Sequence, residues 1–309
     1  MKIRYSETFF SPQGEGKYTG HPSLWIRFAF CNLECHGFGQ PDPTDPDTYI
    51  LDFKDFDPEA QGIKKVEDLP VWTRGCDSSY TWAQKYAHLL KHKTVEEVVD
   101  ELTDLMRSEY NPDGLFVNPH TGQDTHLCFT GGEPLYSQRE LIEIMDEFIR
   151  RGNVPRHVTI ETNTTRELSS KFIQAVGRWR NTDEMEELFF SCSPKLFSVS
   201  GEKPEKAIRP EIMGSYQHLR TVCWGHKMQV NGQIKIVANG SERTWVEFED
   251  AVQQFRNIGV TWPVYAMPVG ATLEEQQVTA GDVAVQAIKR GYIVSARVHV
   301  YLFGNSIGT

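Results

Sequence analysis

The chain has no apolar run long enough to cross a membrane and no excess of basic residues. Its 309 residues contain no stretch of about 18 consecutive apolar side chains, so no spanning helix is expected. The first residues, 1–6, lack the apolar core of a signal peptide, and we expect a cytoplasmic location. A formal net charge of −10 argues against a general polynucleotide-binding surface, which needs a basic face.

Cysteine is scarce, and its spacing is informative. Of the six cysteines, only Cys31 and Cys35 form a close pair, and 40 residues separate Cys35 from Cys76. In a reducing compartment such residues stay as thiols or bind metal. A zinc site needs four ligands, which His36 could complete, so a zinc-stabilised binding module is one interpretation. The other is a [4Fe–4S] cluster, in which three thiolates leave one iron open for a further ligand.

Segments typical of strands and helices alternate along the chain. This order predicts an α/β fold with a mostly parallel sheet and crossover helices. The expected strands are 22–30, 126–130, 158–161, 188–191, 233–237, 263–266 and 292–300, and the expected helices are 94–108, 138–151, 170–180, 245–257 and 276–290. In the first of these helices Thr94 and Glu97 can form a capping box, and Val95, Val98, Val99, Leu102 and Leu105 form an apolar stripe.

Polar clusters follow the predicted strands rather than precede them. In a parallel barrel the carboxyl ends of the strands form one mouth, so these clusters should converge there. The clusters are Thr130-Gly131-Gly132-Glu133-Pro134, Glu161-Thr162-Asn163, Ser193-Pro194-Lys195 and Met267-Pro268. A Gly-Gly-Glu turn at a strand end can hold the amino group of a ligand bound to an open iron, which favours the cluster over zinc.

Two stretches depart from the rhythm of strands and helices. Residues 37–74 are rich in Pro and Asp, and residues 200–232 have scattered aromatic side chains without a clear period. We therefore predict a single domain, 1–309, with an insertion at about 37–74 and a second, irregular excursion at about 200–232. The insertion is expected on the surface, where it covers the cluster or binds a reductant.

Several motifs of the sequence resemble those of a known family. Phe10-Ser11-Pro12-Gln13-Gly14-Glu15-Gly16, then Arg27, then Cys-Asn-Leu-x-Cys, are similar to the 7-carboxy-7-deazaguanine synthase family of radical S-adenosylmethionine enzymes. Gly75-Cys76-Asp77-Ser78-x-Tyr80 is similar to its third-cysteine motif, and the clusters after the strands, with Lys235-Ile236-Val237, follow in the family's order. The 40-residue gap before Cys76 and the loosely matching end of the chain depart from the family's pattern.

The resemblance implies a fold and an activity. The fold would be an incomplete TIM-type barrel of the radical S-adenosylmethionine superfamily. The enzyme would be a lyase that converts 6-carboxy-5,6,7,8-tetrahydropterin to 7-carboxy-7-deazaguanine by radical ring contraction with loss of ammonia. The cofactors would be a [4Fe–4S] cluster, S-adenosylmethionine and Mg²⁺, and the protein mainly orients them.

The resemblance also implies roles for individual residues, with no catalytic side chain beyond the cofactor ligands. Cys31, Cys35 and Cys76 would ligate iron, and Ser78 would ligate Mg²⁺. The S-adenosylmethionine site would be formed by Asp77, Gly131, Gly132, Glu133, Glu161, Ser193, Lys195 and Met267. The pterin site would be formed by Pro12, Gln13, Gly14, Glu15, Arg27 and Thr130.

Partners follow from the same resemblance. We expect a flavodoxin- or ferredoxin-like protein reductant, a homodimer, and no direct contact with nucleic acid or membrane. The product would enter queuosine-type transfer RNA modification or DNA modification. A different radical S-adenosylmethionine enzyme, such as a glycyl-radical activase, is the alternative; it shares the cluster and the Gly-Gly-Glu turn but lacks the set Gln13, Glu15 and Arg27.

Overall fold

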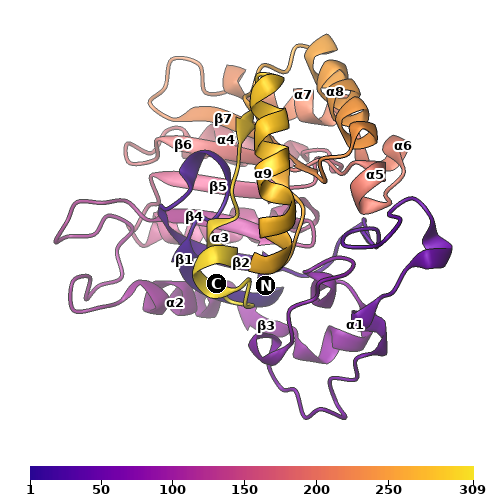
Figure 1. The fold of residues 1–309 in the computed structure, drawn as a ribbon. Coiled ribbons are helices and arrows are strands. Elements are labelled where there is room, and N and C mark those ends of the chain that lie inside the picture. Colours follow the sequence, from indigo (N-terminus) through magenta and orange to yellow (C-terminus); the bar gives the residue numbers. More distant parts are fainter.

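A single nine-stranded sheet organises the computed structural model, which describes residues 1–309 (Figure 1). The spatial order is β3-β1-β2-β4-β5-β6-β7-β8-β9. The strands are β1 (Lys2–Pro12), β2 (Pro22–Phe28), β3 (Lys91–Thr94), β4 (His126–Gly131), β5 (His157–Thr162), β6 (Glu187–Cys192), β7 (Gln229–Ala238), β8 (Val264–Pro268) and β9 (Ile293–Val294). All neighbours from β2 to β9 pair in parallel, whereas β1 is antiparallel to both β2 and β3. The predicted mostly parallel α/β sheet is therefore confirmed.

Helices connect the parallel strands and cover the sheet. They are α1 (Asp52–Asp55), α2 (Val95–Met106), α3 (Gln138–Arg150), α4 (Ser170–Trp179), α5 (Phe197–Ser200), α6 (Pro204–Ala207), α7 (Pro210–His218), α8 (Glu242–Asn257), α9 (Leu273–Lys289) and α10 (Val298–Phe303). Strand β6, in the middle of the sheet, is buried at every residue, including the polar Glu187 and Ser191. None of the helices is both long and apolar enough to span a membrane.

The predicted capping box at the start of α2 is confirmed. The Thr94 side chain accepts from the Glu97 amide, and the Glu97 carboxylate accepts from the Thr94 amide at 2.7 Å. Such reciprocal bonds satisfy amide groups that have no partner within the helix. The predicted stripe is right at four positions, but Met106 takes the buried place expected for Leu105, which is exposed.

The prediction that 200–232 is irregular is wrong. This segment contains α6 and α7, and Pro204 and Pro210 each occupy the first turn of a helix, where a proline loses no hydrogen bond. Helix α7 has only nine residues and buries Ile212, Met213 and Tyr216. Two turns are too short to show a periodic pattern in the sequence, and burial against the sheet supplies the stability that the local pattern does not reveal.

The prediction of a last strand over 292–300 is also wrong in its second half. Strand β9 ends at Val294, and α10 begins at Val298. The Ser295 amide still donates to Ala266, but the Val298 amide donates to the Gly14 carbonyl at 2.8 Å. The chain therefore leaves the sheet and crosses toward the loop after β1, which brings Arg297 and His299 to the mouth of the sheet.

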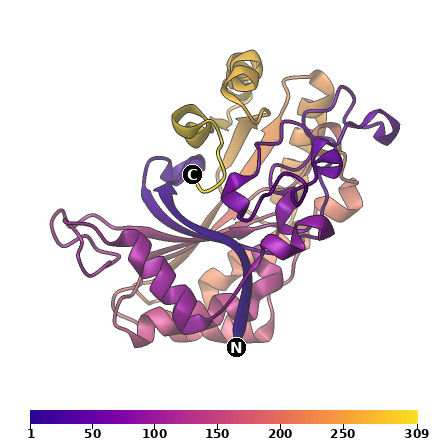
Figure 2. The ribbon, with the colours of Figure 1, turned by 90° about the horizontal axis from the view of Figure 1, so that it is seen from below.

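Strands β1 and β3 were not expected from the sequence. The β1–β2 hairpin places Glu7 opposite Arg27, after a break in register between Tyr5 and Glu7. Figure 2 shows β1, in indigo, curving along the edge of the sheet toward the end of the chain. The turn at 12–16 begins beside the amino end of β2, where Pro12 pairs with Pro22, and residues 12–15 line the same cavity as the loops at the carboxyl ends of the parallel strands.

The insertion at 37–74 is more than a polar surface loop. It contains α1 and buries Phe53, Val66, Leu69 and Trp72 in a small core of its own, together with Tyr80, Tyr86 and Leu89. The two ends of the insertion reach the mouth of the sheet, where Phe38, Gly39, Val71, Trp72 and Thr73 line a cavity.

Candidate active site

One cavity of about 320 Å³ lies at the carboxyl ends of the parallel strands, within the size range of ligand pockets. Every residue predicted to bind cluster, cofactor or substrate lines this cavity, except Glu133. The lining residues come from the turn after β1, the loops after β2, β4, β5, β6 and β8, strand β7, both ends of the insertion and the last segment of the chain. The predicted convergence of the polar clusters at one mouth is therefore present.

Three cysteines line the same part of the cavity. Cys31 and Cys35 lie on the loop after β2, and Cys76 arrives from the end of the insertion. Cys31, Cys76 and Phe38 pack against the buried cluster of Leu33, Cys35 and Ala207. None of the three cysteines forms a disulfide. The backbone of Cys35 has a φ of 50°, and the Glu202 carboxylate holds this turn by accepting from the amides of Glu34 and Cys35.

Burial keeps these thiols protonated in the absence of a metal. It raises the pKa of Cys31 to about 11 and that of Cys76 to about 12. A metal takes the place of the proton and removes this cost. The Leu33 amide and the Asn163 side-chain amide both donate to Cys31 Sγ, at 3.4 and 3.7 Å. These contacts would tune a metal-bound thiolate.

The geometry around the cysteines is not that of a single-ion site. No three His, Cys, Asp or Glu side chains converge closely enough to hold one metal ion. His36, the residue that could have completed a zinc set, does not line the cavity; its ring lies 5.8 Å from that of Phe53 and 5.9 Å from that of Trp82. Three thiols that share one cavity without meeting at a point suit a group larger than one ion.

The Gly-Gly-Glu turn packs tightly against the loop that carries Cys31. A Cβ on Gly132 would overlap the Phe30 carbonyl and lie 2.6 Å from the Cys31 Cβ, so only glycine fits there. A Cβ on Gly131 would lie 2.6 Å from the Phe28 carbonyl oxygen. The two glycines therefore leave backbone, rather than side chains, facing the cavity.

Glu133 lies behind the turn instead of in the cavity, unlike the position expected for it. Its fully buried carboxylate accepts from the amides of Leu135 and Asn163 and from the Thr162 hydroxyl. Burial raises its pKa to about 7, and the three donors offset part of that rise. Glu133 thus ties the loop after β4 to the loop after β5 and shapes the turn.

A buried ion pair network lies where the turn after β1 meets β5 and β7 in the cavity. Lys235 on β7 donates to Glu15 at 2.5 Å and to Glu161 at 3.1 Å. Glu161 also accepts from the Gln13 side chain at 3.0 Å. The neighbouring cations hold the pKa of Glu15 well below its usual range, although burial alone would raise it.

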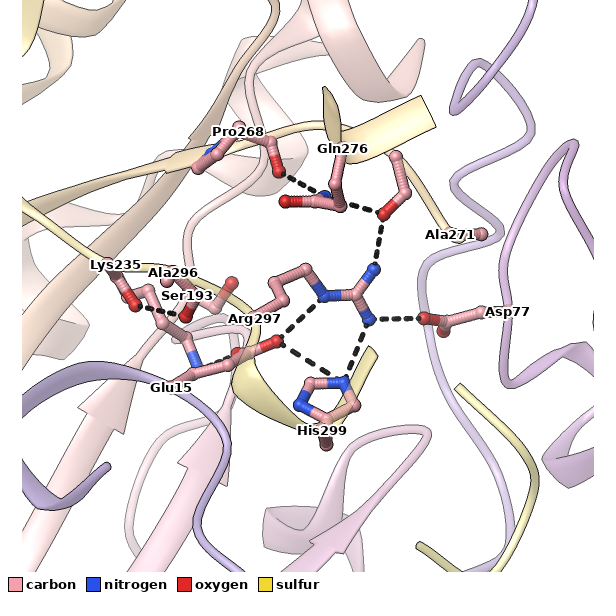
Figure 3. A network of polar contacts seen from close by, with 12 residues as sticks. Glu15, Asp77, Ser193, Lys235, Pro268, Ala271, Gln276, Ala296, Arg297 and His299 are labelled. Carbon is pink, nitrogen blue, oxygen red and sulfur yellow. Dashed lines mark hydrogen bonds and ion pairs between the residues drawn. The ribbon is translucent and has the colours of Figure 1, made fainter. Parts of the chain in front are cut away.

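Arg297 lies at the centre of a second set of contacts (Figure 3). Its guanidinium donates to Glu15 at 3.0 Å, contacts Asp77 at 3.4 Å and donates to the Gly270 carbonyl at 2.7 Å. His299 lies 4.0 Å from Glu15, and burial is the main cause that lowers its pKa to about 4. The His299 ring covers Gly14 so closely that a Cβ there would collide with it. Glu15 and Asp77 thus face the same cation.

Arg27 has a counter-ion that sequence reasoning missed. The guanidinium donates to the buried carboxylate of Glu7 at 2.6 Å and to the Ser78 hydroxyl at 3.3 Å. The Tyr80 hydroxyl donates to the same Glu7 oxygen at 2.9 Å. Glu7 and Tyr80 therefore fix the direction of the Arg27 side chain, which lines the cavity.

Other residues that line or support the cavity were named only within motifs or not singled out at all. Lys235 and Arg297 supply the buried cations, Glu7 holds Arg27 and Glu202 holds the turn at Cys35. The only signal in the sequence was a charged residue within an apolar strand, as at Glu7 and Lys235. Nothing local marks Arg297 or Glu202, because their partners lie 282 and 167 residues away.

No family model matches the chain. It is 25% identical over 309 residues to the 7-carboxy-7-deazaguanine synthase of Rhodopirellula baltica, with 98% of this chain and 88% of that protein covered. To the synthase of the same name from Halobacterium salinarum it is 23% identical, with 97% and 90% covered. The crystal structure of QueE from Escherichia coli is 15% identical, with a TM-score of 0.48 over 96% of this chain and 93% of that one. The sequence similarity to these two synthases confirms, over nearly the whole length of the chain, its resemblance to 7-carboxy-7-deazaguanine synthases.

Proposed function

We propose that the chain is a 7-carboxy-7-deazaguanine synthase, a radical S-adenosylmethionine lyase that acts on 6-carboxy-5,6,7,8-tetrahydropterin. One observation carries the proposal above all. The three cysteines, the Gly-Gly turn and the set Gln13, Glu15 and Arg27 line one cavity although they come from separate loops. The full-length similarity to synthases of that name supports it.

The donor set fits the cofactors that this function needs. Cys31, Cys35 and Cys76 would hold a [4Fe–4S] cluster through three irons, and no His, Asp or Glu side chain converges with them as a fourth metal ligand. When bound, the cluster would supply the electron that cleaves S-adenosylmethionine reductively to start the radical reaction. The hydrogen-bond donors at Cys31 Sγ and the Glu202-held turn would keep the cysteine loop in place.

The loops after β4, β5, β6 and β8 would bind S-adenosylmethionine. Gly131 and Gly132 offer backbone groups at the cavity wall, and Glu133 supports them from behind. Lys195 donates to Ser193 at 2.8 Å, so that a cation and a hydroxyl stand together at the end of β6. Asp77, Glu161 and Met267 would complete this site.

The turn at 12–15, Arg27 and Thr130 would bind the pterin. The pyrimidine edge of a pterin presents adjacent N–H donors. Each Glu15 oxygen already pairs with one cation and can still accept a second hydrogen bond, from such a donor. Arg27, whose charge is offset by Glu7, is held where it can fork onto the substrate carboxylate. Arg297 and His299 would face the same ligand.

Mg²⁺ would bind beside the pterin through Ser78 and, less directly, Asp77. The Ser78 hydroxyl donates to Asp77 at 3.1 Å, which puts a hydroxyl and a carboxylate together, the oxygen ligands that Mg²⁺ prefers. Arg27 and Arg297 contact the same two side chains, so a bound cation would displace hydrogen bonds to both. The substrate carboxylate would then satisfy the two guanidinium groups.

The proposed function also bears on the type of barrel, the role of the insertion and the partners of the chain. The open, mostly parallel sheet is consistent with an incomplete TIM-type barrel in a single domain, and the core of the insertion suits a cover beside the cluster. A flavodoxin- or ferredoxin-like reductant, a homodimer and delivery of the product to transfer RNA or DNA modification remain predictions.

The direct test is anaerobic turnover of the carboxylated tetrahydropterin by the reconstituted enzyme with S-adenosylmethionine, Mg²⁺ and a chemical reductant. We expect 7-carboxy-7-deazaguanine to form, identified by mass spectrometry, together with ammonia. Cleavage of S-adenosylmethionine without any conversion of the pterin would instead support the glycyl-radical activase alternative. A colourless protein that binds zinc and no iron would overturn both.

Arg27→Ala is expected to lower kcat/KM for the pterin at least about tenfold. A lost charged contact costs on the order of 1.5–3 kcal/mol of binding, and here it also leaves the buried Glu7 without its cation. Iron content and uncoupled S-adenosylmethionine cleavage should persist, because Arg27 contacts no cysteine. Arg156→Ala is the matched control, since Arg156 pairs with Asp124 outside the cavity. Unchanged pterin turnover in the Arg27 variant would refute its substrate role.

A further inference from the structure

The segment that follows Glu15 runs from the cavity toward the opposite end of the sheet. Gly16–Tyr18 form a short 3₁₀ turn, η1. The Tyr18 ring packs against His126, with 4.6 Å between the ring centroids, and the Tyr18 hydroxyl donates to Glu187. His126 and Glu187 are the first residues of β4 and β6, whereas the cavity lies at the carboxyl ends of these strands. The turn therefore lies beneath the loop that carries Glu15.

Two consecutive amides of this turn are held by side chains from distant segments. The Gly16 amide donates to the Ser295 hydroxyl at 2.8 Å, and the Lys17 amide donates to the side-chain carbonyl of Gln233 at 2.8 Å. Ser295 directly follows β9 and Gln233 lies on β7, and their exposed fractions are only 3% and 1%. Neither side chain lines the cavity, so each acts on a ligand only through the residues that it holds.

Gly16 packs so closely against the Gln233 side chain that only glycine fits there. Its φ is 71°, in the left-handed region, and a Cβ would lie 2.2 Å from Gln233 Nε2. The Gln233 side chain is itself fixed, because its Nε2 donates at 2.9 Å to the hydroxyl of Ser191, the residue paired with it in β6. The backbone of the residue after Glu15 thus rests on a buried, hydrogen-bonded amide.

Strand β7 holds both the backbone beside Glu15 and the carboxylate of Glu15. Gln233 and Lys235 are two residues apart on this strand, so their side chains leave the same face of the sheet. Gln233 accepts from the turn that follows Glu15, and Lys235 pairs with the Glu15 carboxylate. An ion pair to a flexible lysine lets the carboxylate move with its cation, whereas the hydrogen bonds to the turn fix the backbone from which the Glu15 side chain starts.

We infer that Gln233 and Ser295 are positioning residues that hold Glu15 where a pterin can donate hydrogen bonds to it. The inference rests on the proposed function, because that function assigns Glu15 to the pterin. A misplacement of about 1 Å in a group that orients a ligand can cost on the order of a hundredfold in rate. Loss of either anchor should therefore weaken pterin binding while the cluster and S-adenosylmethionine sites stay intact.

The first test measures the affinity of the reconstituted, unreduced enzyme for 6-carboxypterin, the fluorescent oxidised analogue of the substrate, with S-adenosylmethionine bound. Gln233→Met keeps the length of the side chain but cannot accept from the Lys17 amide. Ser295→Ala removes only the acceptor of the Gly16 amide, so this variant decides the question if Gln233→Met does not fold. We expect the Kd of the analogue to rise at least about fivefold in Gln233→Met and about threefold in Ser295→Ala. Iron content and the Kd of S-adenosylmethionine should stay at their wild-type values.

Gln217→Met is the matched control. Gln217 is 6% exposed and joins two backbone groups, since it donates to the Gly259 carbonyl and accepts from the Thr261 amide, each at 2.8 Å, but it lies outside the cavity. Both glutamine variants should lower the melting temperature, and only Gln233→Met should weaken binding of the analogue. Wild-type binding in both Gln233→Met and Ser295→Ala, or equal weakening in Gln217→Met, would overturn the inference.

Hydrogen exchange without any ligand separates this inference from the proposed function. The amides of residues 13–18 should exchange at least about tenfold faster in Gln233→Met than in wild type, while those of residues 131–137 should not change. A wild-type protein that binds no 6-carboxypterin would refute the proposed function, and the exchange rates would then decide whether Gln233 holds the turn. Wild-type exchange across residues 13–18 in both Gln233→Met and Ser295→Ala would refute the positioning role.

Discussion

Cys76→Ala is expected to abolish the [4Fe–4S] cluster and all S-adenosylmethionine cleavage. In the sequence 40 residues separate Cys76 from Cys35, yet Cys76 lines the same cavity as Cys31 and Cys35. With two thiolates left and no other metal-ligand side chain converging there, the cluster has no third anchor. Iron and sulfide analysis after anaerobic reconstitution should fall from about four of each per chain to a small fraction of that.

The control for this result is Cys223→Ala. Cys223 is also buried, but it lies in the segment before β7 and does not line the cavity. This variant should keep a full complement of iron and the broad absorbance near 400 nm. If Cys76→Ala retained an intact cluster that cleaves S-adenosylmethionine, Cys76 would not be an iron ligand and the proposed function would lose its basis.

Lys235→Met is expected to destabilise the fold by about 3–5 kcal/mol. Lys235 is only 3% exposed and is the cation between the carboxylates of Glu15 and Glu161. Removing it leaves buried negative charge without its main partner. The free energy of unfolding is measured by urea denaturation at pH 7. Lys227→Met, which removes an exposed ion pair with Glu186, should change it by less than about 1 kcal/mol.

The loss of unfolding free energy in Lys235→Met should depend on pH in a defined direction. In the wild type the pKa of Glu15 lies below its ordinary value of 4.5, so its contribution to stability is present above pH 4.5 and declines as the pH falls further. Without Lys235, Arg297 is the remaining close cation of Glu15, so the pKa of Glu15 is higher than in the wild type, and its protonation at low pH relieves the less compensated charge. The two stability curves should therefore converge toward pH 4. A difference that stays constant with pH would show that lost packing, rather than lost charge pairing, causes the effect.

Most of the fold could be predicted because the sequence patterns that specify its strands and helices lie within short segments. The alternation of strands and helices, the capping box at Thr94 and the polar clusters after each strand are contained within short segments. Helices α6, α7 and α10 could not be predicted. Each is only a few residues long, so packing against the rest of the chain, rather than an internal pattern, decides its conformation. Strand β3 reads as polar, since it lies at the sheet edge beside β1.

The residues of the candidate site fall into the same two groups, those marked by local motifs and those placed only by tertiary contacts. The cysteines, the Gly-Gly turn and the loop residues could be predicted from contiguous motifs. The local conformation of each motif depends mainly on adjacent residues in the sequence. The charges between them are assembled by the fold: Lys235 reaches Glu15 across 220 residues, and Arg297 reaches it across 282. The sequence by itself identified the candidate side chains, which the structure places around one cavity. Only the tertiary structure decided that Glu7 orients Arg27, that Glu133 supports the turn from behind and that the end of the chain closes over Gly14, because these are contacts between distant segments that no local pattern encodes.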